Sequence, residues 1–125
     1  MLYLLALDER PDYLHARVTG ERTSQNFLRY LEEAFAACIA AGLRKVLLEM
    51  HLSGPSLSSV CIVNIISLTL PEALKLTKVA FVEAAGGDPA MALAETAALN
   101  RGVNARFFNA VGEAASWLSD APAGR

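Results

Sequence analysis

The spacing of hydrophobic residues changes along the chain, and each spacing predicts an element. In residues 13–19 apolar and polar side chains alternate, which is the two-residue period of a half-buried strand. An apolar run at 2–7 precedes it across turn residues at 8–12, so we expect two antiparallel strands joined by a turn. Over 23–41 the apolar residues recur at intervals of three and four, which predicts an amphipathic helix.

The rest of the chain repeats the order helix, strand. We expect further strands at 45–50, 78–83 and 105–108, and further helices at 56–70, 89–101 and 110–119. Strands reached through helices form parallel sheets with right-handed crossovers. The predicted fold class is therefore α/β: a mixed sheet of about five strands, mostly parallel with one antiparallel edge strand, flanked by about four helices. One domain covers 1–120, and 121–125 is a frayed tail.

Capping residues support several of these boundaries. Thr23 or Ser24 can cap the first helix, and Gly42 stands where a left-handed residue ends it. Asp88 is placed to cap the helix that has Pro89 at its first position.

The helix expected at 56–70 is the most unusual segment. No residue from 52 to 71 is Asp, Glu, Lys, Arg or His. Pro55 and Pro71 bracket this stretch and leave about 15 residues, whereas a membrane-spanning helix needs about 20. The segment is therefore a buried element or a surface for a partner.

A helical projection of this segment gives two apolar stripes. The first contains Leu57, Cys61, Ile65 and Leu68, and the second, nearly opposite, contains Ile62, Val63, Ile66 and Leu70. One stripe can face the sheet. The second can be covered by neighbouring helices, by a protein partner or a second copy in a homodimer, or it can line an apolar ligand pocket.

Composition narrows the class of protein. Of 125 residues, 54% are hydrophobic and 19% charged, with a net charge of −2 and acids and bases interspersed. This favours a compact folded chain and gives no electrostatic footprint for nucleic acid or an anionic membrane. Cys38 and Cys61 are expected to be reduced, buried thiols. The apolar start lacks the basic region of a signal peptide, which predicts a cytoplasmic protein.

Polar residues gather after two of the predicted parallel strands. His51, Ser53, Gly54 and Ser56 follow one strand, and Asp88 follows another. Ligands of open α/β sheets bind at the carboxyl ends of strands, and a helix N-terminus attracts anions. These residues are a candidate anion or ligand loop, although the serines can also simply cap the next helix.

The sequence contains only weak motifs for an enzyme or a metal site. Ser56 lies in a partial match to the G-x-S-x-G nucleophile elbow, but Pro55 stiffens the turn and no acid is evident to orient His51. A serine hydrolase is therefore the third-ranked function, and no catalytic residue is assigned. His15 is expected on the polar face of its strand beside Arg17, as a surface or partner-facing residue. We expect no metal and no cofactor.

The chain resembles the STAS domain, and more closely the SpoIIAA-like proteins of the STAS and CRAL-TRIO superfamily. The resemblance is carried by residues 18–23 with Asn26, by 44–50, 52–56, 95–97 and 100–102, and by 113–114 with 117–118. It implies a non-enzymatic regulatory or interaction module. It also implies a serine at the start of the helix that a partner kinase phosphorylates. Ser58 corresponds best, with Ser59 and Ser56 as neighbours, although Leu57 stands where such domains have an aspartate.

Our interpretation is a module that binds a protein partner or itself through helix 56–70. The candidate interface is the second stripe: Ile62, Val63, Ile66 and Leu70. CRAL-TRIO relatives hold lipids, so the alternative function is binding of a small apolar molecule or lipid at the loops around His51, Ser53 and Ser56.

Overall fold

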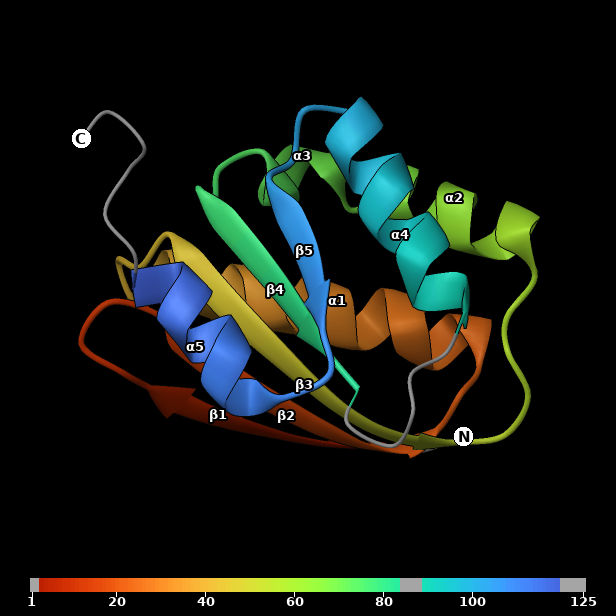
Figure 1. Ribbon diagram of the computed structural model, residues 1–125, viewed down its shortest axis with the longest axis horizontal. Coiled ribbons are helices and arrows are strands. Elements are labelled where there is room, and N and C mark those ends of the chain that lie inside the picture. Colours follow the sequence, from red (N-terminus) through yellow and green to blue (C-terminus); the bar gives the residue numbers. More distant parts are fainter. Residues whose placement is uncertain (1–2, 84–88, 120–125) are drawn as a thin grey trace.

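The computed structural model describes residues 3–83 and 89–119 and contains one mixed sheet (Figure 1). Its five strands follow the chain in the order β1 (Tyr3–Glu9), β2 (Leu14–Glu21), β3 (Lys45–Ser53), β4 (Lys78–Val82) and β5 (Ala105–Phe108). β1 pairs antiparallel with β2, and every later pair is parallel. The α/β prediction with one antiparallel edge strand is confirmed.

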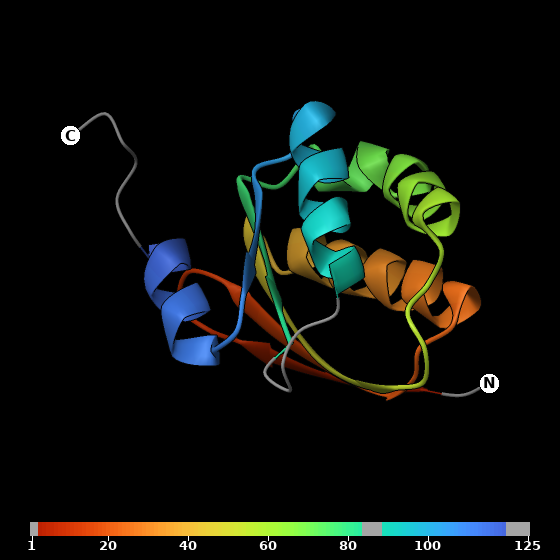
Figure 2. The same cartoon turned by 45° about the vertical axis from the view of Figure 1, so that its right-hand side comes forward.

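The helices divide unequally between the two faces of this sheet (Figure 2). One face is covered by α1 (Ser24–Ala40), α2 (Ser59–Leu68), α3 (Leu70–Ala73) and α4 (Pro89–Asn100), and the other carries α5 (Val111–Ser119). From β2 to β5 each parallel strand is added on the same side of the one before it. Right-handed crossovers between such strands all lie on one face of the sheet. Only α5, which follows the last strand, is free to pack on the opposite face.

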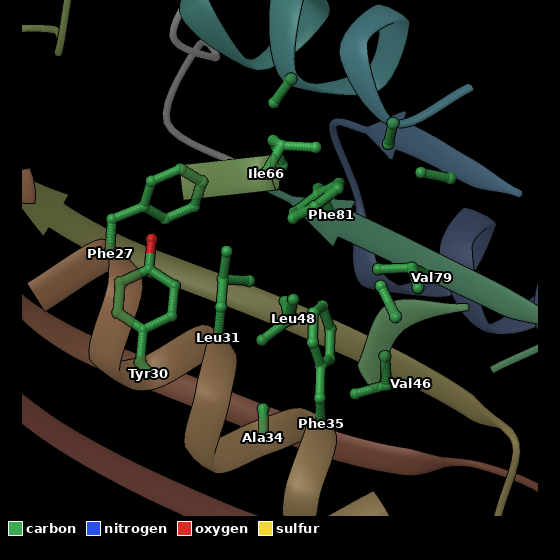
Figure 3. Packing of buried hydrophobic residues seen from close by; sticks show 14 of the residues in the cluster. Phe27, Tyr30, Leu31, Ala34, Phe35, Val46, Leu48, Ile66, Val79 and Phe81 are labelled. Carbon is green, nitrogen blue, oxygen red and sulfur yellow. The ribbon is translucent and has the colours of Figure 1, made fainter. Parts of the chain in front are cut away.

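The main core lies between the sheet and α1, α2 and α4. Leu14, Ala16 and Val18 of β2 are completely buried there, which confirms the predicted alternation. Figure 3 shows Phe35 of α1 beside Leu48 of β3, in the same cluster. A smaller core on the other face joins Leu47, Ala80 and Val82 to Ala114 and Leu118 of α5.

The capping signals of α1 hold in the structure. The Thr23 hydroxyl oxygen accepts a hydrogen bond from the Asn26 N–H at 3.1 Å. Gly42 has φ +76°, the left-handed conformation expected after the last turn. Asp88, the cap predicted for α4, lies outside the described residues.

The predicted limits of helix 56–70 are wrong, because the observed helix α2 starts at Ser59 and ends at Leu68. Ser58 is the N-cap, so residues 56 and 57 belong to the loop. Thr69 separates α2 from α3, and Pro71 stands in the first turn of α3. Proline lacks an N–H and its ring crowds the carbonyl four residues earlier, so α2 cannot continue through it.

Two strands are longer than predicted. β1 continues through Glu9, and β3 continues beyond Met50 through Ser53. In both cases β2 supplies the pairing, because Glu9 lies opposite Leu14 and Ser53 opposite Glu21. Pairing with a neighbouring strand thus extends both elements past the limits of their own hydrophobic runs.

Candidate functional site

Arg22 links the carboxyl ends of three strands. Its N–H donates to the Ser53 carbonyl at 2.7 Å, and its guanidinium donates to the Gly54 carbonyl and forms an ion pair with Glu83. Both charged side chains are largely buried. A buried, hydrogen-bonded arginine is a rigid anchor, so the loop after β3 has a defined position from which α2 starts.

Ser58 begins α2 and is exposed. Its hydroxyl oxygen accepts a hydrogen bond from the Cys61 N–H at 3.2 Å. Ser59 is the first helical residue and Ser56 lies in the loop, and both are also exposed. All three candidate serines are therefore at the surface, and Ser58 is the one that caps the helix.

The inner face of α2 corrects the predicted interface. Ile62 is 0% exposed and Ile66 5%, and both belong to the main core together with Ile65. The buried face therefore combines residues from both predicted stripes. Ile62 and Ile66 are not available to a partner in the folded chain, since α4 and α1 pack against α2 on this side. Val63 and Leu70 are half-buried at the margin of the core.

The outer face of α2 is formed by Val60, Asn64, Ser67 and Leu68, which we call the α2 surface. Val60 is 69% exposed and Leu68 63% exposed, while Asn64 and Ser67 between them are exposed and uncharged. Arg101 borders this surface and donates to the Ser67 hydroxyl at 3.2 Å. The α2 surface is thus an uncharged helical face with an aliphatic side chain near each end.

A second polar cluster lies on the opposite face of the sheet, around Glu49. Its Oε1 lies 2.7 Å from Nε2 of His15, and its Oε2 lies 2.6 Å from Nε2 of His51. Arg17 Nε approaches Oε1 at 3.5 Å. His15 is therefore not a free surface residue, as the sequence suggested, but is joined to β3 by this carboxylate.

The surroundings of Glu49 stabilise its charged form. Burial alone raises the pKa of the carboxyl group, but hydrogen bonds from His51 and His15 and the charge of Arg17 outweigh burial. The net result is a pKa below the ordinary value of a glutamate. Within 3–83 and 89–119, no group of three or more His, Cys, Asp or Glu side chains could hold a metal ion.

The residues of the predicted ligand loop divide between these two clusters. His51 points to Glu49 on one face of the sheet, whereas the carbonyls of Ser53 and Gly54 accept hydrogen bonds from Arg22. Asp88 lies outside the described residues. Glu49 is the acid beside His51 that the spacing of the sequence motif did not indicate.

The core beneath the loop contains little space. One cavity, lined among others by Leu57, Ile62 and Met91, leaves about 10 Å³ for the centre of a water molecule. A second, beside Ile66 and Phe81, is equally small. Each has room for about one water molecule, far below the volume of a lipid.

One of these interactions, between Glu49 and His51, had a signal in the sequence. Glu49 and His51 are two residues apart in a strand, and such residues share a face. That alternation identifies the pair, but His15 joins them only through the register between β2 and β3. Arg22 and Glu83 are separated by 61 positions, so their ion pair requires the fold.

Comparison with known proteins identifies the fold. No protein-family model matches the chain, and no curated protein matches it. A solved structure of an uncharacterized protein from the DUF3478 family, with a SpoIIAA-like fold, from Shewanella loihica PV-4 does match. The two share 20% identity over 93% of each chain, with a TM-score of 0.57. The fold is SpoIIAA-like. The resemblance seen in the sequence is confirmed at the level of fold.

Two remaining expectations concern membranes and thiols. Among the described helices, none has the length and apolar character needed to cross a bilayer. Cys38 and Cys61 are both free thiols, but only Cys38 is buried, and Cys61 is half-exposed. Burial raises the pKa of the Cys38 thiol to about 11.

Proposed function

We propose that this chain is a non-enzymatic interaction module that binds a protein partner through the α2 surface. The observation that carries the proposal is the exposure of Val60 and Leu68 on a helix without charged residues. Exposed aliphatic side chains on one helical face supply apolar area, and Asn64 between them can form hydrogen bonds. The anchor at Arg22 supports the proposal, because a fixed helix loses little entropy on binding.

Affinity capture from the source cell with mass spectrometry tests this proposal. Val60→Asp and Leu68→Asp place a charge on the α2 surface, and each should abolish capture of the same partner. Leu4→Lys is the matched control, because Leu4 is 75% exposed on β1, a different part of the fold. A partner retained by both α2 variants would exclude the α2 surface as its binding site.

We propose further that phosphorylation of Ser58 controls this binding. A phosphate at the first turn is favoured by the helix dipole, so α2 stays folded while negative charge appears at the same end of α2 as Val60. Desolvating that charge against an apolar partner is costly, so binding weakens.

Ser58→Asp and Ser58→Asn separate charge from capping. Both residues are good N-caps, so both variants should keep the melting temperature of the wild type. Only Ser58→Asp should weaken partner binding, measured by calorimetry with the captured partner. Equal affinities for the two variants would refute a charge switch at Ser58.

A further inference from the structure

The two edges of the sheet differ in how they are protected. Edge strands of natural proteins are usually short, charged, bulged or covered, because their unpaired backbone groups otherwise recruit another strand. β5 fits this rule, since it has four residues, includes exposed Arg106, and donates the Phe107 N–H to the Glu95 carboxylate at 2.6 Å.

β1 has only part of this protection, because its charged residues, Asp8 and Glu9, stand at its C-terminal end. Its seven residues pair with β2 in one unbroken register, so it contains no bulge, and residues 3–7 include no charge and no proline. Leu4 is 75% exposed and Leu7 47% exposed. Within the described part of the chain, β1 pairs with β2 alone, and no element lies beyond it in Figures 1 and 2.

α1 leaves this edge accessible. An open groove of about 670 Å³ is lined by residues of β1 and α1, among them Tyr3, Leu5, Leu28 and Glu33, and the Tyr3 hydroxyl donates to the Glu33 carboxylate across it. This groove lies on the α1 face of the sheet, whereas a further strand would approach β1 in the plane of the sheet, where Figures 1 and 2 show no described element.

We propose that β1 pairs antiparallel with β1 of a second copy of this chain, around a two-fold axis midway between the two facing copies of Ala6. The product is a dimer with one continuous ten-stranded sheet. This interface is separate from the α2 surface, so it does not depend on the proposed partner binding.

The geometry of an antiparallel ladder selects this register. Residues of β1 alternate in pointing their N–H and C=O groups toward β2 or away from it, and outward residues must pair with outward residues of the second copy. The numbers of two paired residues therefore sum to an even number, so one residue faces its own copy and the two-fold axis passes between these two copies. An axis at Ala6 is the choice that pairs all seven residues of β1.

This register is also compatible in charge and apolar character. It places Leu5 opposite Leu7 of the second copy, and the acidic residues Asp8 and Glu9 opposite Leu4 and Tyr3. Registers centred nearer the end of β1 bring the acidic residues of the two copies together, which is unfavourable. The two-fold axis is normal to the sheet, so the two grooves open on the same face and adjoin at the axis.

Sedimentation velocity of the full chain tests the association and its register. We expect a mass of twice 13.4 kDa at micromolar concentration. Leu4→Asp places two acids opposite each other at two symmetric positions, whereas Leu4→Lys creates opposite charges there. Leu4→Asp should raise the dimer dissociation constant at least about tenfold relative to Leu4→Lys. A monomeric wild type, or a dimer equally affected by both substitutions, overturns the proposal.

Disulfide cross-linking tests the position of the axis. In a Cys61→Ser background, Ala6→Cys brings two thiol-bearing residues to facing positions, where Cα atoms are about 4.5–5.5 Å apart and a disulfide can form. Leu4→Cys is the control, because its two copies are about 14 Å apart along the strands despite its greater exposure. We expect a covalent dimer for Ala6→Cys only. A dimer that Leu4→Cys cross-links instead places the axis elsewhere and overturns the proposed register.

Failure of this proposal is distinguishable from failure of the proposed function. Leu68→Asp should leave the dimer mass unchanged while it abolishes partner capture. A dimer dissociated by Leu68→Asp and unaffected by Leu4→Asp would place the self-interface on α2 and exclude β1.

Discussion

Truncation of Ile66 and of Leu68 to alanine should have very different effects on stability. The two residues are two positions apart in α2, yet Ile66 is 5% exposed and Leu68 63% exposed. Ile66→Ala removes methyl and methylene groups from the main core, whereas Leu68→Ala removes them from the surface. The pair therefore tests which face of α2 is inside the protein.

The magnitude for Ile66 follows from burial and from the neighbouring cavity. Removal of a buried isoleucine side chain to alanine costs about 2–5 kcal/mol, and the cost grows with the volume of the void left behind. Ile66 already lines a small cavity with Phe35, Thr69 and Phe81, so the new space adds to an existing one. We expect a loss of about 3–4 kcal/mol for Ile66→Ala. Leu68→Ala should change stability by less than about 0.5 kcal/mol.

Urea unfolding followed by circular dichroism measures both values. The slope of free energy against urea should stay constant, so the midpoint alone should move. In thermal unfolding, a loss of 3–4 kcal/mol corresponds to a fall in melting temperature of about 10–15 °C for a chain of this length. Similar losses for the two variants, or a larger one for Leu68→Ala, would refute the orientation of α2 and with it the α2 surface.

Three further predictions concern charge and thiols. Because the pKa of Glu49 is lowered in the folded state, its stabilising effect is present above the unfolded pKa and disappears as pH falls through the folded pKa. Glu49→Gln should therefore cost about 1–3 kcal/mol at pH 7 and progressively less below about pH 4, by urea titration at each pH. Arg22→Met should cost about 3–5 kcal/mol because it leaves Glu83 buried and unpaired, and Arg22→Met combined with Glu83→Leu should cost less, as a double-mutant cycle will show. Cys61 should react readily with a thiol reagent at pH 8, while Cys38, whose pKa is raised to about 11, should react only on unfolding; two fast thiols would contradict its burial.

Most of the fold could be predicted from local patterns. The alternation in β2, the cap at Thr23 and the left-handed Gly42 each have a local physical cause, and each occurs as expected. The predicted ends of elements differ from the observed ones where a neighbouring strand or a proline determines the end. β3 runs on to Ser53 because β2 pairs with it, and α2 stops at Leu68 because Pro71 follows.

The site was less predictable, because its side chains come from distant parts of the chain. The uncharged stretch correctly marked a helix with a buried face, but the projection assigned Ile62 and Ile66 to the wrong environment. Residues 56–70 do not form the single helix predicted, because α2 begins after Ser58 and Thr69 separates it from α3. The buried side is set by where α4 and α1 lie, and the sequence of the helix alone does not contain that information.

The two proposed interfaces have a joint consequence for affinity. A two-fold axis normal to the sheet leaves α1 and α2 of both copies on the same face, so the dimer presents two α2 surfaces to one side. A partner with two binding sites can then engage both, and its second contact forms at a high effective concentration. Leu4→Asp should therefore weaken binding of a two-site partner by separating the copies, and should leave binding of a single-site fragment of that partner unchanged. Calorimetry with both forms of the partner measures this difference, and equal effects on the two forms would show that the α2 surfaces act independently.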